Sequence, residues 1–227
     1  MSHKAQYIDL GLIDYKQAWD YQQKKADELI NADEKTNYLI FCEHPHVYTL
    51  GKSGKPNNLL INDEFLKKIK ASFFKTNRGG DITYHGPGQI VAYPIFDLNY
   101  LKIGVKNHVH KIEEAVIKTL AEYNIKSERL EGATGVWIDT NKPDKTRKIC
   151  AIGVRVTKFV TMHGLALNVN TDLNYFKHIN PCGYIDKSIT SLGAELNVNV
   201  DTKHTKKILL KYFTEIFELK IHNSLET

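Results

Sequence analysis

Hydrophobic and polar positions along the 227-residue chain predict alternating helices and strands. Apolar residues recur at helical spacing in residues 15–30, which follow Asp14, in residues 106–123 and in residues 204–219. Shorter apolar stretches rich in β-branched residues predict strands at residues 38–42, 47–50, 90–95, 135–139, 148–157 and 160–170. Pro94 should place its strand near a sheet edge, because proline cannot donate to a strand ladder. The last two strands are joined around Lys158, which predicts a hairpin.

These elements predict a mixed or antiparallel α/β sheet flanked by helices. The most polar stretch, residues 139–147, is too short for a domain linker and is typical of an exposed turn. We therefore expect residues 1–227 to form one domain. The last helix carries an apolar stripe that includes Leu209, Phe213 and Phe217. We interpret this stripe as core packing and not as a membrane or partner surface.

Composition favours a globular protein of a reducing compartment. The chain is 42% hydrophobic and 25% charged, which is ordinary for a folded domain. Its start lacks the apolar core of a signal peptide, and no run approaches the roughly 20 apolar residues of a bilayer span. We expect a soluble cytoplasmic protein that does not bind membranes. Cys42, Cys150 and Cys182 have no paired spacing, which argues against a disulfide framework.

The chain carries a mild excess of positive charge. Its 31 Lys and Arg against 26 Asp and Glu leave a formal net charge of +5. The lysines alternate with apolar residues at helical spacing, as Lys203, Lys206 and Lys207 do, which is typical of a solvated helix face. We therefore expect no nucleic-acid partner, and the charge is consistent with an acidic protein partner.

A glycine-rich segment is the strongest candidate for a binding site. Residues 78–89 read RGGDITYHGPGQ, which places Arg78, Tyr84 and His85 among four glycines and a proline. Glycine allows a backbone to turn through positive φ or to approach a ligand closely, and proline stiffens the chain between such points. The segment therefore predicts a rigid binding loop. The alternative is an elaborate hairpin connection.

Several motifs together resemble the octanoyltransferases of lipoate synthesis, the lipoyl(octanoyl) transferases. Besides RGGDITYHGPGQ, these motifs are EHPHVYTLG at residues 43–51, KICAIG at 148–153, MHGLALN at 162–168 and NPCG at 180–183. They occur in the family's order over about residues 15–196. The resemblance implies the α/β fold that this family shares with the biotin and lipoate protein ligases.

The resemblance implies that Cys182 and Lys148 are the catalytic residues. Cys182 lies in a Pro-Cys-Gly turn, where a thiol can stand clear of the core, and matches the family's acyl-accepting cysteine. Lys148 matches the family's active-site lysine, and its ammonium would lower the pKa of the thiol from about 8.5 and so raise the thiolate fraction. Cys150 is a rival, because residues two apart on a strand share a face and Cys150 should therefore face the same way as Lys148. Its strand context favours burial, and we prefer Cys182.

The implied reaction is a two-step acyl transfer without ATP or another cofactor. The Cys182 thiolate would take an octanoyl group from the phosphopantetheine thioester of acyl carrier protein, and a lysine of an acceptor would then attack the acyl-enzyme thioester. The acceptors would be the lipoyl domains of 2-oxoacid dehydrogenases and the glycine cleavage H protein. We expect a monomer. Glycine-rich segments near Gly79, Gly80 and Gly153 are candidate oxyanion donors.

The resemblance also places substrate contacts in three segments. These comprise Arg78, Gly79, Gly80, Asp81, Ile82, Thr83, Tyr84 and His85; Ala151, Ile152 and Gly153; and Gly164, Leu165 and Ala166. They are small or apolar where an eight-carbon chain would pass. His85 could equally hydrogen-bond within the site or brace the loop.

Two other functions are kept as alternatives. The first is an ATP-dependent lipoate or biotin protein ligase, although the Gly-Lys-Ser at residues 51–53 lacks the upstream glycine of a phosphate-binding loop. The second is a non-enzymatic metal-binding or carrier-binding module, because Cys42, His44 and His46 alternate and would face one way on a strand. Pro45 interrupts that set, and we expect no metal. Activity without ATP and metal analysis would separate these alternatives.

Overall fold

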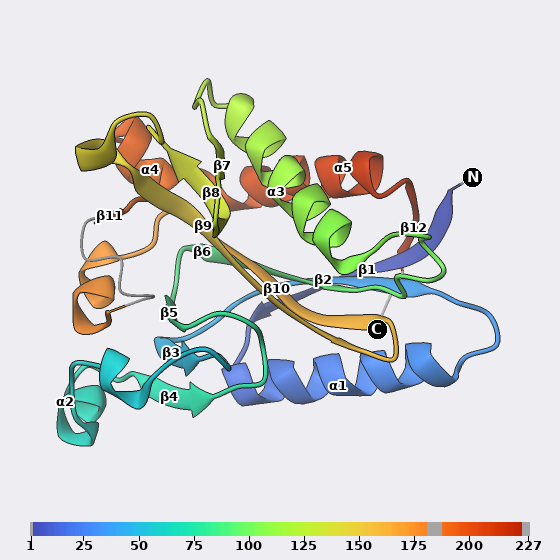
Figure 1. Cartoon of the computed structure of the whole chain (residues 1–227), viewed down its shortest axis with the longest axis horizontal. Coiled ribbons are helices and arrows are strands. Elements are labelled where there is room, and N and C mark those ends of the chain that lie inside the picture. The colour runs from blue at the N-terminus through green and yellow to red at the C-terminus, as the bar shows by residue number, and fades with distance from the viewer. Residues whose placement is uncertain (1, 181–187, 224–227) are drawn as a thin grey trace.

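The computed structural model describes residues 2–180 and 188–223, and Cys182 lies outside them. In these residues a nine-stranded mixed sheet and a three-stranded sheet lie beside five α-helices (Figure 1). The large sheet has the order β12 (Leu219–Asn223), β1 (His3–Leu12), β2 (Asn37–Glu43), β6 (Gln89–Ile95), β10 (Val160–Asn168), β9 (Arg147–Thr157), β8 (Ala133–Ile138) and β7 (Glu128–Leu130), with β11 (Ser188–Ile189) paired to β9. The small sheet has the order β4 (Ser72–Lys75), β3 (Val47–Leu50) and β5 (Ile82–His85). The helices are α1 (Tyr15–Asn31), α2 (Asp63–Lys68), α3 (Val105–Ala121), α4 (Leu192–Leu196) and α5 (Thr202–Ile216).

The central strands of the large sheet are buried on both faces. Helix α1 covers one face, and α3 and α5 cover the other (Figure 1). In β2, Leu39 and Phe41 pack in the cluster that contains α3 and α5, whereas Ile40 and Cys42 pack in the cluster that contains α1. Successive strand residues point to opposite faces, and this explains why these strands are almost continuously apolar.

The predicted helices are confirmed, with changes at their ends. The Asp14 side chain caps α1 by accepting hydrogen bonds from the backbone N–H groups of Lys16 and Gln17. The apolar stripe of α5 packs in the core, where Leu209 and Phe213 are fully buried. That helix ends earlier than predicted, because the chain turns at Glu218 and enters β12. Strands β1 and β12 were not predicted. Strand β1 lies between β2 and β12 in the sheet, and β12 pairs with β1 across the length of the chain.

The predicted strands and hairpin are present, but the position of Pro94 was predicted wrongly. Strand β6 lies inside the sheet, between β2 and β10. Its register with β10 runs from Gln89 to Ala92, so Pro94 lies just beyond it. There the Thr161 hydroxyl donates to Pro94 O at 2.6 Å and accepts from the backbone N–H of Phe96 at 2.9 Å. The Thr161 side chain thus satisfies the carbonyl of Pro94 and the amide of Phe96 where the regular ladder between β6 and β10 has ended.

The glycine-rich segment is only partly a loop. Its middle forms β5, which pairs with β3 in the small sheet, with Thr83 opposite Thr49. The predicted rigid loop is therefore wrong for residues 82–85 and describes only the turns on either side of them. The segment is rigid because its strand is hydrogen-bonded into a sheet.

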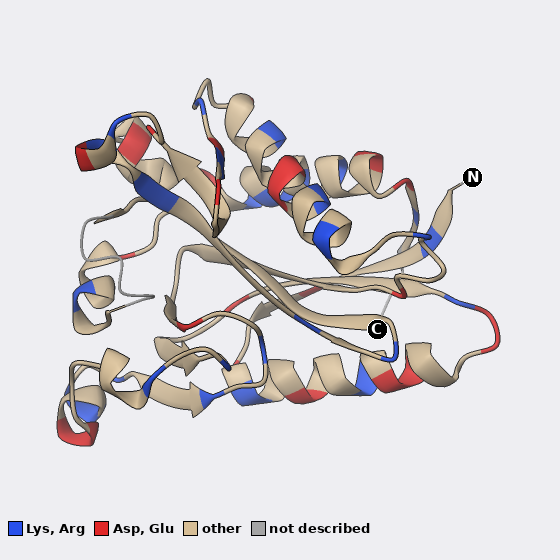
Figure 2. Cartoon of the chain, in the orientation of Figure 1, with Lys and Arg blue, Asp and Glu red and all other residues tan. Residues whose placement is uncertain are grey.

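Charged residues lie mainly on helix surfaces and turns, with both signs interspersed (Figure 2). Lys67, Lys68, Lys203 and Lys207 are exposed, as expected for solvated helix faces. Lys206 was expected to be exposed as well, but its side chain is largely covered and is paired with Asp9 and Glu43. None of the helices within residues 2–180 and 188–223 is sufficiently long and apolar to cross a membrane.

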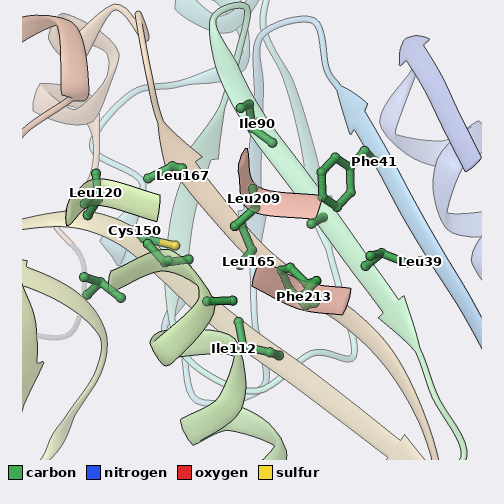
Figure 3. Packing of buried hydrophobic residues seen from close by; sticks show 14 of the residues in the cluster. Leu39, Phe41, Ile90, Ile112, Leu120, Cys150, Leu165, Leu167, Leu209 and Phe213 are labelled. Carbon is green, nitrogen blue, oxygen red and sulfur yellow. The ribbon is translucent and has the colours of Figure 1, made fainter. Parts of the chain in front are cut away.

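Replacement of Leu167 tests the double-sided burial. Leu167 is fully buried near Cys150 and Leu165 (Figure 3). We expect Leu167→Ala to lower the free energy of unfolding by about 2–5 kcal/mol in urea titrations, because a central strand leaves little room for the core to relax. Leu12→Ala is the matched control: Leu12 is 66% exposed, and its loss should change stability by less than about 0.5 kcal/mol. Equal effects of the two changes would contradict this packing.

Candidate active site

One cavity of about 310 Å³ brings the predicted segments together, with walls from β5, β6, β8, β9, β10 and the start of α1. The residues predicted from the sequence that line it are Arg78, Gly80, Asp81, Ile82, Thr83, His85, Lys148, Ala151, Ile152, Gly153, Gly164, Leu165 and Ala166. Residues that the sequence did not single out also line it, among them Tyr15, Gln89, Tyr93, Trp137, His163 and Asn168. Tyr15 begins α1 and the positions of the others follow from strand pairing, although His163 and Asn168 lie in the MHGLALN motif.

Gly79 and Tyr84 do not line the cavity. The Tyr84 ring points into a separate cluster, where it stacks on Tyr175 at 4.8 Å between centroids and its hydroxyl bonds His46 Nδ1 at 2.7 Å. Tyr84 and His85 are consecutive on β5 and therefore point to opposite faces. Tyr84 packs the small sheet against the segment Leu173–His178. Its neighbours Thr83 and His85 line the cavity.

The Gly79 amide is already hydrogen-bonded. It donates to Val154 O at 2.9 Å, so in this structure it is not free to act as an oxyanion donor. A Cβ atom on Gly153 would lie 2.8 Å from Gly79 O, and so the close approach of the loop to β9 requires glycine there.

Lys148 and Cys150 do not share a face, contrary to the prediction. Trp137 pairs with Lys148 but its neighbour Val136 pairs with Cys150, which leaves Ile149 as an extra residue in β9. This β-bulge reverses the alternation of side chains. Cys150 is fully buried in the core (Figure 3), and burial raises the pKa of its thiol. Lys148 lines the cavity.

The predicted nucleophile, Cys182, lies outside the described residues. The cavity is lined by Ile179 on the N-terminal side of residues 181–187 and by Ser188 on their C-terminal side. Strand β11 pairs Ile189 with Lys148, and Thr190 N–H donates to Lys148 O at 2.9 Å.

Arg78 braces the cavity wall. Its Nη2 atom donates to the backbone O of Thr49 at 2.6 Å and to the Thr49 hydroxyl at 2.9 Å, and its Nη1 atom donates to Gly79 O at 3.0 Å. The guanidinium thus ties the turn before β5 to strand β3. Arg78 is 8% exposed, and water competes little for these bonds.

His85 is held as one neutral tautomer. Gln89 Nε2 donates to Tyr84 O and to Asn168 Oδ1, so its Oε1 atom faces His85 Nδ1 at 2.8 Å. An amide oxygen only accepts, which places the proton on Nδ1 and leaves Nε2 to accept from the Thr49 hydroxyl at 3.3 Å. Burial, assisted by the nearby His44 and by the charge of Arg78, lowers the pKa of His85 to about 3. His85 therefore braces the cavity wall and is uncharged at neutral pH.

Of the alternating residues near β2, Cys42 Sγ lies 3.5 Å from His44 Nε2, but His46 does not join them. His44 Nδ1 lies 2.8 Å from Ile13 O and its Nε2 lies 2.8 Å from the Tyr93 hydroxyl, while His46 bonds to Tyr84. Across the described ranges 2–180 and 188–223, no three potential ligand residues are grouped to hold a metal ion.

Comparison with known proteins identifies the family. Residues 14–214 match the lipoyl protein ligase A/B catalytic domain. The chain belongs to this family. A relative from Cytophaga hutchinsonii named octanoyltransferase is 53% identical over 96% of this chain and 95% of its own length. Another from Parabacteroides distasonis, with the same name, is 54% identical over 93% and 97%. The resemblance inferred from the motifs is confirmed.

Solved structures described as lipoate protein ligases share the fold. A putative lipoate protein ligase from T. acidophilum superposes with a TM-score of 0.72 at 16% identity, covering 97% of this chain and 88% of that chain. A lipoate-protein ligase A bound with ATP gives 0.69 at 16% identity, covering 100% and 90%. The predicted fold class is confirmed.

The depressed pKa of His85 predicts a pH-dependent stability. The folded protein binds this proton only near pH 3, whereas the unfolded chain binds it at about pH 6.5. Stability should be complete above pH 6.5 and should fall as the pH drops toward 3, by about 1.4 kcal/mol per pH unit for this residue. His108 and His163 are shifted in the same direction and add to the slope.

The contribution of His85 can be isolated by comparing slopes. Urea unfolding at several values between pH 6.5 and pH 5 should give a mean slope that is smaller in His85→Gln by about 1 kcal/mol per pH unit, because the unfolded histidine is only half protonated at pH 6.5. A constant loss of stability in the variant does not affect this difference. An unchanged slope would mean that His85 is protonated in the folded protein.

Proposed function

We propose that this protein is an octanoyltransferase that moves an octanoyl group onto a lysine of lipoyl domains. The observation that carries the proposal is the identity above 50% to octanoyltransferases over more than nine-tenths of the chain. The ligase structures share only 16% identity and support the fold alone. Chemistry follows the residues of a site and not the fold.

The cavity suits a medium-length acyl chain. Its walls include Val91, Ile152, Leu165 and Ala166, which offer apolar surface to methylene groups. At about 0.8 kcal/mol for each buried methylene, six of them would contribute roughly 5 kcal/mol to binding. The acyl chain would lie along β10 and β9, with its carbonyl toward Lys148.

Cys182 is the proposed nucleophile and Lys148 its partner. Ile179 lines the cavity and precedes Cys182 by three residues, a length of chain that spans at most about 11 Å. Lys148 also lines the cavity and is paired with the strand that follows residues 181–187. An ammonium near a thiol stabilises the thiolate, which is the reactive form.

The reaction would proceed in two steps. The Cys182 thiolate attacks the carbonyl carbon of the donor thioester, and the donor C–S bond breaks to release a thiolate that takes a proton from Lys148. The amine of the acceptor lysine then attacks the octanoyl-cysteine thioester and forms an amide. The Cys182 thiolate leaves, and the proton lost by the amine returns to Lys148. No ATP is required, because the donor thioester already carries the activation.

Acyl carrier protein is the proposed donor, and the protein is proposed to act as a monomer. The formal net charge of +5 suits an acidic carrier. The lipoyl domains of 2-oxoacid dehydrogenases and the glycine cleavage H protein are the proposed acceptors. An ATP-dependent ligase is the competing function, and transfer from octanoyl carrier protein without ATP separates the two.

Acylation should occur on one cysteine. After exposure to octanoyl carrier protein, intact-mass spectrometry should show one octanoyl group, and peptide mapping should place it on Cys182. Cys182→Ser should abolish transfer without changing the circular dichroism spectrum. Cys150→Ala is the matched control and should retain transfer, because that thiol is buried in the core. An octanoyl group on Cys150 would refute the assignment.

Lys148 should control the reactivity of the thiol. In Lys148→Ala the rate of alkylation of Cys182 by iodoacetamide should titrate at higher pH, because the thiolate loses a neighbouring positive charge. The same change should slow acylation by roughly tenfold or more. Lys145→Ala, at an exposed lysine in the turn before β9, is the control. A profile that does not change in Lys148→Ala would remove the assigned role.

A further inference from the structure

Lys148 does not simply project into the cavity. Its Nζ atom lies 4.5 Å from the centroid of the Trp137 ring, within the distance at which an ammonium is attracted to an indole face. Trp137 is 2% exposed, and its Nε1–H donates to Ala133 O at 2.8 Å. This hydrogen bond fixes the edge of the ring and leaves the ring face toward Lys148.

The bulge in β9 creates this contact. If the register of Val136 with Cys150 continued, Ile149 would lie opposite Trp137. The extra residue shifts the pairing, so that Lys148 is the direct cross-strand partner of Trp137. Directly opposed residues on neighbouring strands have adjacent side chains. The contact between Lys148 and Trp137 therefore follows from the pairing of the two strands.

A buried carboxylate of α3 is hydrogen-bonded to strand β8, which carries Trp137. Glu113 of α3 accepts the backbone N–H of Gly135 at 3.1 Å and is paired with Arg129 at 3.0 Å. Gly135 has φ +123°, and a Cβ atom there would lie 2.5 Å from Cys150 O and 3.4 Å from Lys148 Cε. Glycine thus lets β8 pass close to the lysine side chain while Trp137, two residues later, covers its charged end.

We propose that Trp137 is a positioning residue of the acyl transfer, whose indole face holds the Lys148 ammonium at the cavity wall. This inference rests on the role given to Lys148 in the proposed function. A long, flexible lysine loses side-chain entropy when it is held in one place, and the attraction of the ring offsets that loss. The indole ring positions the Lys148 ammonium, and that ammonium stabilises the Cys182 thiolate.

Fluorinated tryptophan tests the electrostatic part of this contact without changing the packing. The chain has two tryptophans, so a Trp19→Phe background leaves Trp137 as the only one. In that background Trp137 is replaced by tryptophan carrying one, two or three fluorine atoms on the six-membered ring. Each fluorine withdraws electron density from the ring face and changes its shape little. All rates are compared with the unfluorinated Trp19→Phe protein.

We expect a graded response. The pH midpoint of Cys182 alkylation should rise with each fluorine, and kcat for octanoyl transfer should fall by about tenfold across the series, with KM and the thermal unfolding temperature unchanged. A residue that only fills space would not produce this gradient. In a Lys148→Ala background the same series should have no effect, because the cation is absent.

The possible results separate this inference from the proposed function. If Lys148→Ala shifts the alkylation profile but fluorination does not, the role of Trp137 is wrong and the proposed function stands. If the fluorine gradient persists without Lys148, the ring acts by another route and the inference is overturned. If Lys148→Ala changes nothing, the role of the lysine fails and the positioning role falls with it.

Discussion

A single extra residue in β9 determines which side chains reach the cavity. The bulge at Ile149 puts Ile149 and Cys150 into the core and Lys148 and Ala151 on the cavity wall. A regular strand would have given Lys148 and Cys150 the same face. One extra residue therefore separates a thiol that is buried in the core from a lysine that lines the cavity, and it sets that lysine against an indole ring.

A network of buried hydrogen bonds connects other parts of the cavity wall. It passes from Arg78 through Thr49 to His85, and from Gln89 through Asn168 to Thr190 O. These hydrogen bonds link the small sheet to the large sheet and then to the segment beside Lys148. Loss of one member would leave a buried donor or acceptor without its partner, at a cost of about 1–3 kcal/mol, so the network favours a single arrangement of the two sheets.

The fold by itself does not select the chemistry. Structures described as lipoate protein ligases share this architecture at 16% identity, and one of them holds ATP. The chemistry of a site follows its side chains and not the fold that carries them. Here the buried arginine donates to Thr49 and to Gly79 O, and the histidine on β5 is neutral, so both brace the cavity wall. The proposed reaction then depends on one cysteine and one lysine, with the acyl chain held by apolar surface.

The sequence alone determined the three long helices, the central strands and the chemical candidates, but not the short helices α2 and α4. Its periodicity records which residues face the core in elements such as α1 and α5, because burial on a helix repeats about every 3.6 residues. Its motifs identified the family and the segments that line the cavity. The tertiary structure alone decided the pairing of β1 with β12, the internal position of Pro94 and the presence of Trp137 beside Lys148. Those features depend on which strands are neighbours and on their register. A shift of one residue exchanges the two faces of a strand, and the local sequence pattern does not show that shift.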